Sequence, residues 1–97
     1  MKEERTMENH PEHMTPQERQ GIALKTETMV QMLQLIADAS DRTDRPIRAW
    51  QARQAIHNLR QAMQRIDSDD LDGAGAYFET ARGFMERLCA KGQGAKA

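Results

Sequence analysis

The sequence has few of the residues that carry covalent chemistry. Its 97 residues include one cysteine, Cys89, and three histidines. A single cysteine excludes an internal disulfide. No apolar run has the roughly 20-residue length of a membrane-spanning helix or the pattern of a cleaved signal peptide. We therefore expect the protein to be located in a reducing cytoplasm. We expect no contact with a membrane.

The candidate catalytic and metal-binding residues do not form a recognisable set. His10 and His13 flank Pro11-Glu12, but no further His or Cys lies nearby to complete a zinc site. His57 has no adjacent Ser or Cys nucleophile and no paired carboxylate. Cys89 lies at the edge of an apolar helix face and is expected to be a small buried side chain. We therefore expect a protein that is not an enzyme and that uses no metal or cofactor.

Hydrophobic periodicity predicts an all-α fold with three helices. The chain is polar overall, with a mean hydropathy of −0.85, and its apolar residues recur at steps of three and four, as they do on one face of a helix. The predicted helices cover about residues 16–40, 46–66 and 70–91. They form one domain over residues 15–91, with a flexible arm at 1–14 and a frayed tail at 92–97. The prediction is a small three-helix bundle, or a helical hairpin plus one helix.

Turn and capping residues mark where the predicted helices begin. Thr15-Pro16-Gln17-Glu18 has the form of a capping box, in which a hydroxyl and a carboxylate each accept a backbone N–H. Pro46 suits the first turn of the second helix, with Thr43 or Asp44 as its cap. The third helix contains three glycines that are expected to allow close backbone approach: Gly73, Gly75 and Gly83. The alternative for the first two is that the helix begins later or frays at its first turn.

The second and third helices resemble part of a tetratricopeptide helical hairpin. The small and aromatic residues that carry the resemblance are Ala62, Asp70-Leu71, Ala74, Phe78 and Ala81. Four positions depart from the family's apolar, aromatic or proline residues: Asn58, Gln61, Arg65 and Glu86. No second copy lies about 34 residues upstream, the period of the repeat. The resemblance implies an antiparallel hairpin, and it implies no peptide-binding groove because that groove needs several repeats.

The stretch MVQMLQLIA, residues 29–37, is too apolar to face a single core. Only Gln31 and Gln34 interrupt it, and its apolar side chains span roughly 220° where a surface helix needs about 100°. We expect one flank to pack on the other two helices and the opposite flank to be covered by a second copy of the chain, as a homodimer. The residues assigned to this interface are Met29, Met32, Leu35 and Ile36.

Trp50 is predicted to lie opposite the apolar seam of the second helix. A lone tryptophan in that position either anchors a partner protein or is covered by its own chain, at the end of the first helix or by the arm. The candidate partner-binding surface consists of the residues that share its side of the helix. These are Ile47, Trp50, Arg53, Gln54 and His57.

Arginines are concentrated in the second helix. No acidic residue occurs between Asp44 and Asp67, a stretch that contains Arg45, Arg48, Arg53, Arg60 and Arg65. The net charge of the whole chain is nevertheless −1, and the arginines do not share one stripe of the helix. Most are expected to be solvated or paired with aspartates of the neighbouring helices. The alternative is that they contact the phosphates of a nucleic acid.

These features predict a binding protein. The sequence has no candidate nucleophile, no set of metal ligands and no phosphate-binding loop. The features left for a function are apolar helix faces, one tryptophan and the arginines. We expect a small helical regulator that binds another protein and inhibits or chaperones it. The alternative is a nucleic-acid-binding regulator that uses the second helix.

Overall fold

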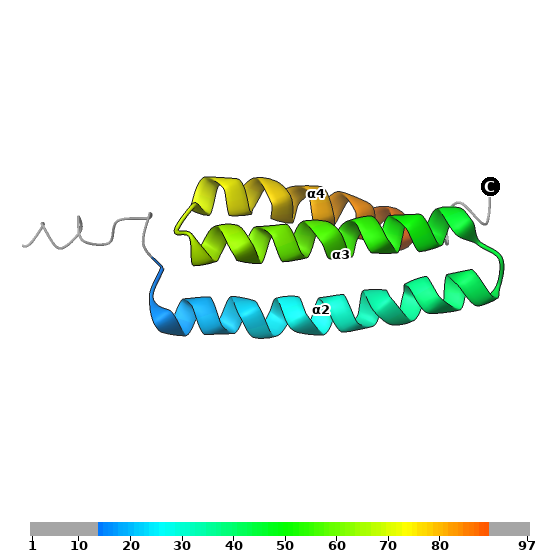
Figure 1. Ribbon diagram of the computed structural model, residues 1–97, viewed down its shortest axis with the longest axis horizontal. Helices are drawn as coiled ribbons and strands as arrows, with labels where there is room; N and C mark the ends of the chain where they lie inside the picture. The colour runs from blue at the N-terminus through cyan, green and yellow to red at the C-terminus, as the bar shows by residue number, and fades with distance from the viewer. Residues whose placement is uncertain (1–13, 90–97) are drawn as a thin grey trace, which may run out of the picture.

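The computed structural model describes residues 14–89, which form three helices (Figure 1). Helix α2 spans Pro16–Arg42, α3 spans Pro46–Asp67 and α4 spans Leu71–Cys89. The predicted all-α fold is confirmed. The predicted end of the third helix lies outside the described residues, as do the tail and nearly all of the arm.

Helix α3 lies between α2 and α4 (Figure 1). Short connections reverse the chain after α2 and again after α3, so each helix runs antiparallel to the next. Helix α3 contacts both neighbours, whereas no Cα atom of α2 comes within 8 Å of one in α4. The antiparallel hairpin implied by the tetratricopeptide resemblance is therefore present as α3 and α4, with α2 packed on the other side of α3.

Small side chains allow α3 to pack against two helices. Four of its alanines are at most 2% exposed: Ala49, Ala52, Ala55 and Ala62. An alanine ends at Cβ, so two helix axes can approach closely where it faces a neighbour. Larger residues fill the remaining space, with Val30 and Leu33 from α2, Leu59 from α3 and Leu88 from α4 in one buried cluster. The core thus lies along α3 and is shared by all three helices.

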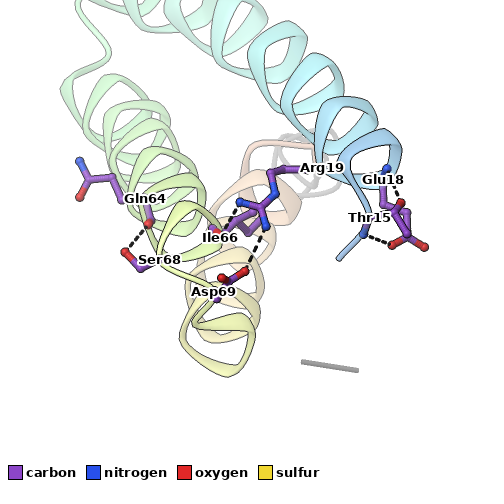
Figure 2. Close-up of polar contacts among 7 residues, drawn as sticks. All are labelled: Thr15, Glu18, Arg19, Gln64, Ile66, Ser68 and Asp69. Carbon is purple, nitrogen blue, oxygen red and sulfur yellow. Dashed lines mark hydrogen bonds and ion pairs between the residues drawn. The ribbon is translucent and has the colours of Figure 1, made fainter. Parts of the chain in front are cut away.

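The capping box predicted at the start of α2 is confirmed. The Glu18 backbone N–H donates to the Thr15 hydroxyl at 3.1 Å, and the Thr15 N–H donates to the Glu18 carboxylate at 2.9 Å (Figure 2). Both bonds satisfy N–H groups that have no partner within the helix. This local pattern explains why the beginning of α2 could be placed from four residues of sequence.

The predicted cap of α3 is wrong. Helix α2 continues to Arg42, so Thr43 closes that helix and its hydroxyl donates to the Ala39 carbonyl at 2.9 Å. Asp44 adopts a left-handed conformation with φ of 58°, which reverses the chain. Arg45 is left as the N-cap of α3 and makes no side-chain capping bond. Pro46 does occupy the first turn, as predicted.

The start of α4 explains one of the three glycines. The Asp70 carboxylate accepts the Gly73 N–H at 2.9 Å, and a Cβ on Gly73 would lie 2.2 Å from the Asp70 Oδ2. Gly75 and Gly83 have nothing within 4 Å of such a Cβ, so close approach is the wrong interpretation for these two. The helix begins at Leu71, before all three glycines, so the alternative of a later beginning is wrong.

Gly75→Ala is expected to stabilise the protein. Alanine favours the interior of a helix over glycine by about 1 kcal/mol, and the added methyl group meets no neighbour at this exposed position. Urea denaturation followed by circular dichroism measures the gain in the free energy of unfolding. Gly73→Ala is the matched control: its methyl group displaces the Asp70 carboxylate from the capping bond, so it gains less or loses stability. Equal gains in both variants would contradict the role assigned to that cap.

Candidate functional site

An apolar stripe runs along the side of α2 that faces away from the core. We call it the α2 outer stripe, and its six residues are all exposed: Gly21, Leu24, Thr28, Met32, Leu35 and Ala39. They follow one another at steps of three and four, over a length of about 27 Å. The buried residues of α2, such as Leu33 and Ala37, lie on the opposite side.

The α2 outer stripe is apolar along its whole length. Leu24, Met32 and Leu35 are 64%, 57% and 69% exposed. Thr28, between them, donates its hydroxyl to the Leu24 carbonyl at 3.0 Å. The hydrogen-bonding capacity of this donor is therefore satisfied within the helix, and the Thr28 methyl group adds to the apolar surface.

The four residues assigned to the dimer interface divide into two pairs. Met32 and Leu35 belong to the α2 outer stripe, whereas Met29 and Ile36 are partly buried and pack against the core of their own chain. Leu24 was missed by the sequence prediction. Its position did contain a signal, because it precedes Leu35 by 11 residues, close to three full turns of helix.

Trp50 lies on the outer side of α3 and touches α4. Its ring meets that of Phe84 edge to face, with the centroids 5.5 Å apart and an interplanar angle of 81°. Trp50 is still 54% exposed, and Ile47, one turn before it, is 71% exposed. Its own chain thus covers part of the tryptophan, through Phe84 of α4. Coverage by the arm falls outside the described residues.

Arg87 extends this aromatic contact. Its guanidinium carbon lies 5.3 Å from the centroid of the Phe84 ring, a distance typical of cation–π interactions. We call Ile47, Trp50, Phe84 and Arg87 the Trp50 surface. Of the other residues predicted with Trp50, Arg53 and His57 are exposed and Gln54 is half-buried on α3. Phe84 and Arg87 were missed because their position depends on the register of the α3–α4 hairpin.

Two arginines of α3 pair with neighbouring aspartates, as predicted. Arg53 donates two hydrogen bonds to Asp41 of α2. These bonds, opposed by partial desolvation of the carboxyl group, lower the pKa of Asp41 below its ordinary value, and they raise the pKa of Arg53. Arg65 lies 3.7 Å from Asp70 and stacks over the Tyr77 ring at 5.8 Å. Both ion pairs are about half exposed, so each adds little stability.

Two further arginines form hydrogen bonds between helix ends, one joining α2 to α3 and the other joining α3 to α4. Arg19 of α2 donates to the Ile66 carbonyl of α3 at 3.3 Å and to Asp69 at 3.0 Å (Figure 2). Arg48 of α3 donates to the Leu88 carbonyl of α4 at 3.2 Å. Each guanidinium satisfies a carbonyl at the negative end of another helix. The arginines of α3 therefore serve different contacts and do not form one continuous charged stripe.

The cysteine and histidine predictions have different outcomes. Cys89 is exposed, and its predicted burial is wrong because the neighbouring Leu88 occupies the core-facing position instead. His10 and His13 lie outside the described residues. Within residues 14–89, no three His, Cys, Asp or Glu side chains gather where they could hold a metal ion. No helix in the same range has both the length and the apolar character needed to cross a bilayer.

A shallow cavity of about 530 Å³ lies where the start of α2 meets the end of α3. Apolar atoms of Met14, Pro16, Ala23 and Met63 form much of its wall. Arg19 also lines it, but its guanidinium is already bound to Ile66 and Asp69. Gln20 and Asp67 line the cavity as well, and both are exposed to solvent. Small-molecule sites place their polar groups inside a largely apolar pocket, so this cavity is a weaker candidate than the two exposed surfaces.

The α2 outer stripe and the Trp50 surface are the candidate sites, and they belong to different sides of the molecule. The first faces away from α3, while the second lies across α3 and α4. One could be occupied without covering the other. Comparisons of the chain with protein-family models, with curated proteins and with solved structures found no significant match.

Proposed function

We propose that this chain is a non-enzymatic interaction module, a small cytoplasmic regulator that forms a homodimer through α2 and binds another protein through the Trp50 surface. Binding would inhibit or chaperone the partner. The observation that carries the proposal is the exposure of large apolar side chains on two separate faces, with Leu35 at 69% and Trp50 at 54%. Contiguous exposed apolar surface is a common mark of a protein–protein contact.

The small size of the domain supports self-association. A core of this size supplies only about 3–5 kcal/mol of stability, and oligomerisation is a frequent supplement. The α2 outer stripe is apolar along its length and therefore complementary to itself, so two copies can bury it against each other about a two-fold axis. Met29 and Ile36, at its edge, would extend that contact.

The nucleic-acid alternative has weaker support. Arg53 and Arg65 are paired with aspartates, and Arg48 is bound to a helix carbonyl. Nucleic-acid binding depends on several cations that are available to phosphates. The other two of the five arginines between Asp44 and Asp67, Arg45 and Arg60, make no salt bridge within residues 14–89.

Trp50→Ala is expected to abolish capture of the partner while leaving the helices intact. Truncation of a tryptophan at the centre of an interface costs roughly 2–4 kcal/mol of binding, whereas this ring contributes only part of its surface to the fold. The measurement is an affinity pull-down of the tagged protein from its native cell lysate, with and without nuclease, read by mass spectrometry. Circular dichroism of the same variant monitors helicity.

Leu24→Ala is the matched control, because it removes an exposed large apolar side chain from the other face. It should retain the partner. Capture by Trp50→Ala at the wild-type level would move the binding site away from Trp50. Partners that disappear with nuclease would favour the nucleic-acid alternative.

A further inference from the structure

We infer that the Trp50 surface recognises an acidic segment of its partner, in which carboxylates flank a large apolar side chain. The inference rests on the proposed function and gives the partner a definite chemistry. It follows from the distribution of charge around Trp50 and from the position of one arginine beside the pair of rings that exposed Trp50 forms with partly buried Phe84.

The outer side of α3 carries no negative charge of its own. Residues 46–66 contain no Asp or Glu, and the first turn of the helix has no acidic residue. The side of α4 that adjoins it is also free of acids, and its residues follow at steps of three and four: Tyr77, Thr80, Phe84 and Arg87. A carboxylate that approaches Trp50 therefore meets no like charge from these two helix faces.

Two of the three acidic residues of α4 are engaged by another arginine. Glu79 and Glu86 both pair with Arg82, at 2.8 and 3.6 Å, on another side of the helix. The hydrogen bond from Arg82 to Glu79 raises the pKa of Arg82. These three residues form their own ion-pair group, so they neither neutralise Arg87 nor repel an acidic ligand at the Trp50 surface. The third acidic residue, Asp72, lies in the first turn of α4, about four turns of helix before Arg87.

Arg87 has capacity to bind a carboxylate. Among the described residues, no carboxylate lies at salt-bridge distance from its guanidinium or from that of Arg60. The contact of Arg87 with Phe84 is a cation–π interaction, with the guanidinium carbon over the ring, and it uses no carboxylate. The N–H groups of the guanidinium lie at the edge of its plane and remain able to form a bidentate contact with a carboxylate.

The apolar part of the surface selects a peptide over a nucleic acid. Ile47 and Trp50 present large exposed side chains next to Arg87 and Phe84. In a peptide, a large apolar side chain can contact Ile47 and Trp50 while a neighbouring carboxylate binds Arg87. The Trp50 surface contains one arginine, Arg87, and the affinity of nucleic-acid-binding proteins depends on the number of phosphate contacts.

The chain's single tryptophan allows a direct test. Two synthetic amphipathic peptides of about 18 residues, or five turns of helix, share a leucine face and lack tryptophan and tyrosine. One carries glutamates on its polar face and the other lysines. We expect the glutamate peptide to change Trp50 fluorescence and to bind about ten-fold more tightly than the lysine peptide at low salt, with the difference shrinking as salt is added.

Variants test whether the preference for the glutamate peptide arises from the Trp50 surface. Arg87→Glu should weaken binding of the glutamate peptide by about ten-fold or more. Lys25→Glu makes the same charge change on the exposed side of α2 and should leave the affinity within about two-fold, since long-range effects are screened. Equal binding of the two peptides, tighter binding of an oligothymidine strand, or no fluorescence change with any probe would overturn the inference.

The outcomes separate this inference from the proposed function. If the peptides show no acidic preference but Trp50→Ala still loses its partner from the lysate, the interaction site stands and the acidic chemistry is wrong. If the glutamate peptide binds in an Arg87-dependent manner while Trp50→Ala keeps the partner, the surface has the inferred chemistry but is not the site proposed for that partner.

Discussion

Leu35→Glu is expected to dissociate the proposed homodimer into monomers. Leu35 is 69% exposed within one chain, so its removal leaves the core of that chain intact. In a two-fold dimer the substitution occurs twice, and burial of each leucine is worth about 1.5–3 kcal/mol. The dissociation constant should rise by roughly 10²–10⁴-fold. Sedimentation equilibrium over a range of protein concentrations measures it.

Ile47→Glu is the matched control for Leu35→Glu. Ile47 is 71% exposed and undergoes the same change from an apolar to an acidic side chain, but it lies on α3 outside the α2 outer stripe. It should leave the dissociation constant of the dimer unchanged. A wild type that sediments as a monomer throughout, or a Leu35→Glu variant that still forms the dimer, would show that the stripe is not the interface. Circular dichroism of both variants should show the helicity of the wild type, so that loss of the dimer is not caused by unfolding.

The fold could be predicted where the signals are local. The capping box at Thr15 and Glu18 joins residues three apart, and the apolar seams join residues three or four apart. Such patterns are fixed by helix geometry, whatever surrounds the helix. The excess apolar arc of α2 was visible for the same reason, and the exposure of Met32 and Leu35 agrees with it.

The connection after α2 could not be placed in the same way. Thr43 is suited both to ending one helix and to starting the next, and the sequence pattern does not decide between these roles. In the structure α2 continues to Arg42, so Thr43 closes α2 and Asp44 reverses the chain. Cys89 shows a related limit: a side chain at the edge of an apolar seam can point inward or outward, and the exposed orientation was not predicted.

The candidate site was predicted only in part, because it combines two helices. Trp50 and Ile47 were identified from their side of α3, which depends on the helix period alone. Their contact with Phe84 and the nearby position of Arg87 depend on how α3 and α4 align along their length. The contact of Arg19 with Ile66 joins residues 47 positions apart, and no short sequence motif reports a contact of that kind.

Leu59→Ala is expected to unfold a large fraction of the protein. Leu59 is 1% exposed and lies in the core cluster of α3, the helix that contacts both others. Replacing a buried leucine by alanine removes transfer free energy and leaves a cavity, at a cost of about 2–5 kcal/mol. A core of this size supplies about 3–5 kcal/mol, so the loss is comparable to the whole stability. Thermal and urea denaturation followed by circular dichroism measure it.

The control for Leu59→Ala is Ile47→Ala, which also truncates an aliphatic side chain on α3. Ile47 is 71% exposed, so its truncation should change the free energy of unfolding by no more than about 0.5 kcal/mol. Similar losses in the two variants would mean that α3 is not buried between α2 and α4 as described. A large loss confined to Leu59→Ala would establish α3 as the centre of the core, which leaves the exposed side chains of α2 and α3 available for binding.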